Sequence, residues 1–145
     1  MNEDPSKPAV ILSDRQDLPV ATDPLIHLAT ATLEAEGAST VELSVSLVGA
    51  DEMADLHQRY LGEPGPTDVL SFPQDEAAPE DGRRLLGDVV ICPEFAVGHG
   101  KELQAELRLL LVHGILHLLG YDHQEEAARR AMWARQETYS GVAAP

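Results

Sequence analysis

The sequence predicts one domain of the α+β class, in which a small mixed sheet of four strands packs against about four to six helices. Two observations lead to this fold class. Segments with the alternating apolar pattern of strands are interspersed with segments of helical period. The chain has 145 residues, and 43% of them are hydrophobic. This length and composition allow one core and leave no room for a second full-sized domain, so residues 1–145 are expected to form a single domain.

The first third of the chain predicts a strand and then a helix. Val10–Leu12 is a short apolar run, and residues 13–17 are polar, which predicts a strand followed by a turn. Asp23 is the expected N-cap of the first helix, with Pro24 at its first helical position and Gly37 at its end. The apolar stripe of this helix consists of Leu25, Leu28, Ala29 and Leu33.

The middle of the chain predicts three more strands and one helix. Residues 41–47 alternate between apolar and polar side chains, as a half-buried strand does. Asp51–Tyr60 has a helical pattern, and Asp68–Phe72 reads as a third strand. Residues 74–86 are polar with proline and glycine and are expected to form a surface loop. Asp88–Cys92 is a continuous apolar run, typical of a strand inside a sheet.

Two helices are predicted at the C-terminal end. Glu102–Leu119 is apolar nearly all round in its second half, which predicts a buried central helix. Gln124–Tyr139 is expected to be the last helix, with Ala128, Met132 and Trp133 turned inward. The apolar stretch 109–119 is too short to span a bilayer and is interrupted by two histidines. The N-terminus lacks the basic and apolar regions of a signal peptide, and Cys92 has no cysteine with which to pair. A cytoplasmic protein is expected.

The most informative segment is HGILHLLGYDH, residues 113–123. His113 and His117 are four residues apart on a predicted helix, so their side chains lie on one face and can meet one ion at about 2.0–2.1 Å. Gly120 is a natural helix terminator, after which the chain can return His123 to the same ion. This spacing predicts one zinc ion per chain. The other histidines, His27, His57 and His99, have no such partners and are expected to be surface or structural residues.

Three histidines leave the fourth position of zinc to a water molecule, which is the pattern of catalytic zinc sites. Zinc lowers the pKa of its bound water to about 7 and so supplies hydroxide at neutral pH. The same histidine and glycine spacing occurs in metzincin proteases, H-E-x-x-H-x-x-G-x-x-H. This chain has Gly114 where those proteases carry their glutamate base. A protease is therefore the second choice among zinc hydrolases.

The segment resembles the signature HGxLHLxGYDH of the YbeY family of ribosomal RNA maturation factors. Upstream, Arg59, the run TDVLSFP at 67–73 and the run GDVVI at 87–91 follow the order and approximate spacing of that family. The resemblance runs from about Met53 to Met132. The connection from Gly87 to His113 is a few residues shorter than in the family, so the helix that precedes the main helix is expected to be truncated or missing.

The resemblance implies a cytoplasmic, metal-dependent endoribonuclease that acts on single-stranded RNA in the maturation of small-subunit (16S) ribosomal RNA and in ribosome quality control. It also implies that Arg59 is catalytic together with His113, His117 and His123. A guanidinium can bind the scissile phosphate or stabilise its developing charge. The alternative is a surface arginine at a helix end. Asp68, Ser71 and Asp122 are expected to be structural or supporting residues.

The charge of the chain limits its partners. Ten Lys and Arg residues face 25 Asp and Glu residues, a net charge of −15. Bulk electrostatic attraction to nucleic acid is therefore excluded, and an RNA site is expected to be a local basic patch on an acidic body. DNA and membranes are not expected as partners. Basic proteins of the small ribosomal subunit suit an acidic surface, so a zinc-stabilised assembly factor that cuts nothing is a third possibility.

Overall fold

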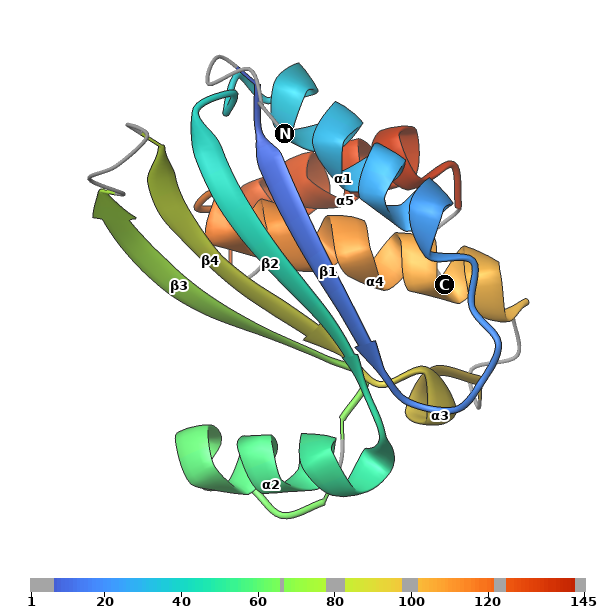
Figure 1. The fold of residues 1–145 in the computed structure, drawn as a ribbon. Helices are drawn as coiled ribbons and strands as arrows, with labels where there is room; N and C mark the ends of the chain where they lie inside the picture. Colours follow the sequence, from blue (N-terminus) through green and yellow to red (C-terminus); the bar gives the residue numbers. More distant parts are fainter. Residues whose placement is uncertain (1–6, 66, 78–82, 98–101, 122–124, 143–145) are drawn as a thin grey trace.

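The computed structural model describes residues 7–65, 67–77, 83–97, 102–121 and 125–142 and contains one four-stranded mixed sheet (Figure 1). Its strands are β1 (Ala9–Arg15), β2 (Val41–Val48), β3 (Val69–Ala77) and β4 (Arg84–Ile91), in the order β1-β2-β4-β3. The pairs β1–β2 and β2–β4 are parallel, and β3 runs antiparallel to β4 at the edge. The predicted α+β class and its four-stranded mixed sheet are confirmed.

Helices cover the sheet unequally (Figure 1). On one face lie α1 (Thr22–Ala35), α4 (Leu103–Leu118) and α5 (Glu126–Ser140), whereas α2 (Ala50–Leu61) lies on the other. The short α3 (Pro93–Ala96) follows β4. The expected truncation of the helix that precedes the main helix falls partly on residues 98–101, which lie outside the described residues. None of the described helices is long and apolar enough to cross a membrane.

The main core lies between the sheet and the α1–α4 layer. The inward side chains of β2, among them Leu43 and Leu47, pack with residues of α4 such as Leu111 and Ile115. A second cluster around Met53 fills the space under α2. Because α4 has the sheet on one side and α1 and α5 on others, it is apolar nearly all round. The predicted buried central helix is confirmed.

Two of the predicted strand boundaries are wrong. The first strand does not end at Leu12, because Ser13–Arg15 continue in register beside β2 up to the pair Arg15–Val48. The surface loop expected over 74–86 is shorter, because β3 extends to Ala77 and β4 begins at Arg84. In both cases polar residues remain in a strand because their backbone groups pair with a neighbouring strand.

The predicted start of the first helix is also wrong. The helix begins at Thr22, with Ala21 as N-cap and without a side-chain cap. The reason is a contact from α4: Gln104 donates a hydrogen bond from Nε2 to the Ala21 carbonyl at 2.9 Å and accepts one from the Ala21 amide at 3.3 Å. This tertiary contact fixes the backbone at the start of the helix, which a capping side chain would otherwise fix. Pro24 still lies in the first turn, where its missing N–H is not needed.

Trp133 is a third correction. In α5 the buried face is formed by Met132 and Gln136, four residues apart, and Trp133 is 44% exposed. Successive helical residues point about 100° apart, so Trp133 turns away when Met132 faces inward. Its ring instead lies under the Arg129 guanidinium, 5.6 Å from the ring centroid.

Candidate active site

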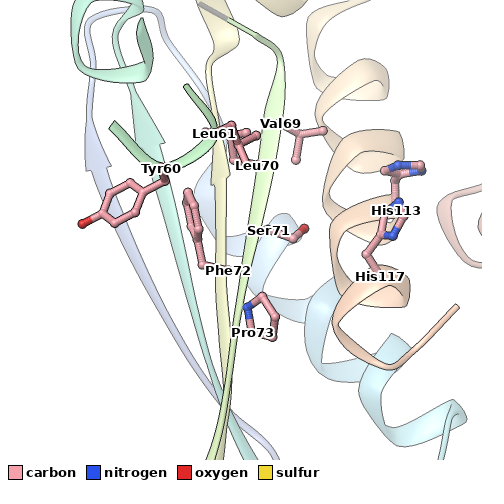
Figure 2. Close-up of a pocket in the computed structure, with 9 residues that line it drawn as sticks. All are labelled: Tyr60, Leu61, Val69, Leu70, Ser71, Phe72, Pro73, His113 and His117. Atoms are coloured by element: carbon pink, nitrogen blue, oxygen red, sulfur yellow. The ribbon is translucent and has the colours of Figure 1, made fainter. Parts of the chain in front are cut away.

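A cavity of about 500 Å³ lies where β3 passes α4 (Figure 2). Nine side chains line it, from the last turn of α2, from β3 and from α4: Tyr60, Leu61, Val69, Leu70, Ser71, Phe72, Pro73, His113 and His117. In Figure 2, Tyr60 and Phe72 lie on one side of β3, and Ser71 and the two histidines lie on the other. The cavity therefore extends across the edge strand.

His113 and His117 lie together on α4, as their spacing predicted. Their ring centroids are 4.6 Å apart, with an angle of 75° between the ring planes. Both side chains are partly buried, and their rings lie one above the other along α4 (Figure 2). One turn of helix is sufficient to bring them together, because residues four apart share a face.

Gln136 of α5 contacts the first of these histidines. Its Oε1 lies 2.7 Å from Nδ1 of His113, and the side chain is buried at 5% exposure. An amide oxygen can only accept, so Nδ1 donates the hydrogen, and in the neutral ring Nε2 then carries the lone pair. Our sequence interpretation missed Gln136. The contact spans 23 residues and two helices, and only the inward face of α5 in the sequence hinted at it.

Gly114, between the two histidines, lies where α4 packs closely against the sheet. A Cβ at this position would lie 2.7 Å from Cγ1 of Val89 and 3.1 Å from Oγ of Ser71. Overpacking of this kind costs about 1–3 kcal/mol, whereas alanine in a helix gains about 0.5–1 kcal/mol over glycine. The packing therefore requires glycine, and the space for the glutamate of a metzincin site is already filled.

Ser71 joins the same contact. Its Oγ donates a hydrogen bond of 3.3 Å to the Gly114 carbonyl, which links β3 to the helix between the two histidines. Asp68 lies just before β3 and is not among the residues that line the cavity; its backbone carbonyl accepts the amide hydrogen of Cys92 at 2.9 Å. Ser71 supports the site directly, and the Asp68 backbone supports the strand ends.

His123 and Asp122 lie outside the described residues. Among those described, no group of three or more His, Cys, Asp and Glu side chains is arranged to hold a metal ion. The chain is described up to Tyr121, two residues before His123. Tyr121 donates a hydrogen bond of 2.8 Å to Glu36 at the end of α1.

The Glu36 carboxylate connects three parts of the molecule. Besides Tyr121, it accepts a short hydrogen bond from the Tyr139 hydroxyl and forms an ion pair with Arg135 at 2.9 Å. Burial opposes ionisation, yet the bonds from Tyr139 and Tyr121 and the charge of Arg135 hold the pKa of Glu36 below its ordinary value. Through its bond to Tyr121, the ionised carboxylate therefore holds the segment that follows α4 against α1 and α5.

Arg59 does not lie in the cavity. Its guanidinium is 61% exposed and pairs with Asp55, one turn earlier on α2, at 2.7 Å. The next residues, Tyr60 and Leu61, are the ones that line the cavity. A helix turns about 100° per residue, so the Arg59 side chain points in a different direction from those of Tyr60 and Leu61. The structure brings His113 and His117 together and leaves Arg59 on the outer surface of α2.

His57, one of the histidines expected to be structural, has both ring nitrogens engaged. Nδ1 lies 2.9 Å from the Gly65 carbonyl, and Nε2 lies 3.0 Å from Oε1 of Glu63. It fastens the segment after α2 to the helix.

Comparison with known proteins identifies the family. The model of the family described as Endoribonuclease YbeY matches residues 12–141, nearly the whole chain. The chain belongs to the YbeY family. The matched range contains α2, β3 and α4, and therefore every residue of the cavity.

Individual relatives agree with the YbeY assignment. A protein named Endoribonuclease YbeY from Parafrankia sp. (strain EAN1pec) is 55% identical over 111 residues, which are 67% of this chain and 69% of that protein. The protein of the same name from Thermobifida fusca (strain YX) is 46% identical over 138 residues, 88% of this chain and 89% of its own. The solution structure of TM1509 from Thermotoga maritima has 29% identity and a TM-score of 0.59, covering 90% of this chain and 86% of that one.

Proposed function

We propose that this chain is a cytoplasmic, zinc-dependent endoribonuclease that cleaves single-stranded RNA in the maturation of small-subunit (16S) ribosomal RNA. The observation that supports it best is the imidazole pair of His113 and His117 in a cavity of a YbeY-family fold. The relatives carry the name endoribonuclease, which supports an RNA substrate. The single sheet and its helices support one domain over residues 1–145.

The donor set fits one zinc ion held by His113, His117 and His123. The fit is supported by the hydrogen bond to Gln136, which turns Nε2 of His113 into the lone-pair nitrogen that a metal needs. Neutral imidazoles on one helix face are typical zinc ligands. When bound, zinc would supply a hydroxide nucleophile near neutral pH.

The residues around this set have supporting tasks. Gln136 holds the His113 ring in one tautomer and orientation. Ser71 and Gly114 hold β3 close to α4 beside the two imidazoles. Because Gly114 leaves no space for a glutamate base, we propose no peptidase activity.

The proposal is tested on single-stranded RNA with purified protein, before and after removal of metal by a chelator and after return of zinc. We expect cleavage that disappears with the chelator and returns with zinc, and no cleavage of an unfolded protein substrate. Zinc-dependent proteolysis would support the metzincin reading instead. Binding to small ribosomal subunits without any RNA cleavage would support the assembly-factor reading, in which acidic surface contacts basic ribosomal proteins.

We propose a more limited role for Arg59 than catalysis at the metal. Its ion pair with Asp55 is exposed on both sides, at 61% and 59%, and such pairs contribute little to stability. The guanidinium can therefore exchange Asp55 for an RNA phosphate outside the cavity. Arg59→Ala should reduce the slope of log K against log salt by about 0.7, the value for one phosphate on a single strand.

The measurement for Arg59 is binding of single-stranded RNA over a range of salt concentrations. Asp55→Ala is the matched control, because it releases the guanidinium and should bind RNA at least as tightly as the unchanged protein. A loss of cleavage by about 10²–10³ in kcat, with unchanged KM, would instead place Arg59 at the scissile phosphate.

A further inference from the structure

Tyr60 is an exposed aromatic residue that the proposed chemistry does not use. It lies at the end of α2 and is 59% exposed, beside Leu61 at 55%. Its ring meets the ring of Phe72 edge to face, with centroids 5.3 Å apart and 60° between the planes. Phe72 in turn packs against the core under α2. The Tyr60 ring is therefore braced on one side and open to solvent on the other.

This aromatic pair and the histidines line the same cavity from opposite sides of β3 (Figure 2). In the sheet order β3 is last, so its outer edge pairs with no described strand. A strand of RNA that crosses this edge can present a phosphate to His113 and His117 and the base of a neighbouring nucleotide to Tyr60.

The charge of the molecule favours such a contact. The chain carries a net charge of −15, and none of the nine described side chains lining the cavity belongs to Asp, Glu, Lys or Arg. Apart from the zinc ion that the histidines would hold, the contacts to RNA in the cavity are therefore uncharged. Stacking on an aromatic ring suits this situation, because every base has a π-face and stacking needs no charge.

We propose that Tyr60 is a stacking platform for an unpaired base next to the scissile phosphate. The inference rests on the proposed ribonuclease function and adds a reason for selecting single strands. In an RNA duplex the bases are already stacked on one another, and an aromatic side chain cannot reach their faces. A base in a single strand can turn out onto Tyr60.

The test measures binding and cleavage separately. Zinc-loaded protein is mixed with a fluorescent single-stranded RNA, binding is followed by stopped-flow anisotropy before cleavage proceeds, and cleavage is followed afterwards. Tyr60→Ala should weaken binding about 5- to 150-fold, the range that loss of one base–aromatic stack covers. Tyr60→Phe keeps the ring and should recover most of that loss. Ile11→Ala is the matched control, since Ile11 is 55% exposed on β1 at the other edge of the sheet.

Substrates with one abasic nucleotide locate the contact. When the missing base is the one that stacks on Tyr60, the RNA should bind the unchanged protein less tightly. The affinity of Tyr60→Ala for the same RNA should not change. Equal RNA affinity of Tyr60→Ala and the unchanged protein would overturn the stacking role, even where cleavage is normal; Tyr60 and Leu61 would then suit a protein partner. If Tyr60→Ala binds RNA less tightly but neither this variant nor the unchanged protein cleaves RNA, the stacking role stands and the ribonuclease proposal is refuted.

Discussion

Replacing His117 by alanine is expected to reduce the zinc content of the purified protein from about one ion per chain to nearly none, and to abolish RNA cleavage. The reason is that two imidazoles on one turn of α4, with ring centroids 4.6 Å apart, are the part of the predicted ligand set that the structure describes. Removing one leaves a set too small for zinc, which takes three protein ligands in catalytic sites. Metal analysis after gel filtration measures this effect.

His27→Ala is the control for this prediction, because His27 is an exposed histidine on α1. It should retain the full zinc content. His113→Ala and His123→Ala should lose zinc as His117→Ala does. Full occupancy in His123→Ala would place the third ligand elsewhere, and full occupancy in His117→Ala would contradict the site altogether.

Replacing Gln136 by methionine is expected to weaken zinc binding about 10- to 100-fold, the usual cost of removing a residue that orients a metal-bound histidine. Methionine has nearly the volume of glutamine and fills the buried site, but it offers no acceptor comparable to the amide oxygen at 2.7 Å from Nδ1 of His113. The His113 ring would then lose the hydrogen bond that fixes its tautomer. Competition for zinc against a chelator of known affinity measures the loss without reference to catalysis.

Gln136→Glu separates the hydrogen bond from packing. A carboxylate still accepts from Nδ1 of His113, so this variant should bind zinc far better than Gln136→Met. Denaturant unfolding of both variants shows whether either has lost stability. Zinc affinity in Gln136→Met equal to that of the unchanged protein would show that Gln136 only fills space.

Local patterns determined the parts of this molecule that depend on residues near one another in the sequence. The alternation over residues 41–47 predicted β2 because side chains of a strand alternate between faces. The apolar second half of 102–119 predicted the buried α4. The pair His113 and His117 could be predicted because one helical turn brings them together wherever the helix lies.

Tertiary packing decided the remaining features. Gln136 and His113 meet because α5 packs against α4, and no pattern within either helix specifies that contact. Gln104 of α4 starts α1 at Thr22 in place of the expected cap at Asp23. The orientation of α2 on the sheet directs Tyr60, and not Arg59, into the cavity. Sequence spacing determines which side chains share a face of one element, whereas the identity of the neighbour on that face depends on how the elements pack.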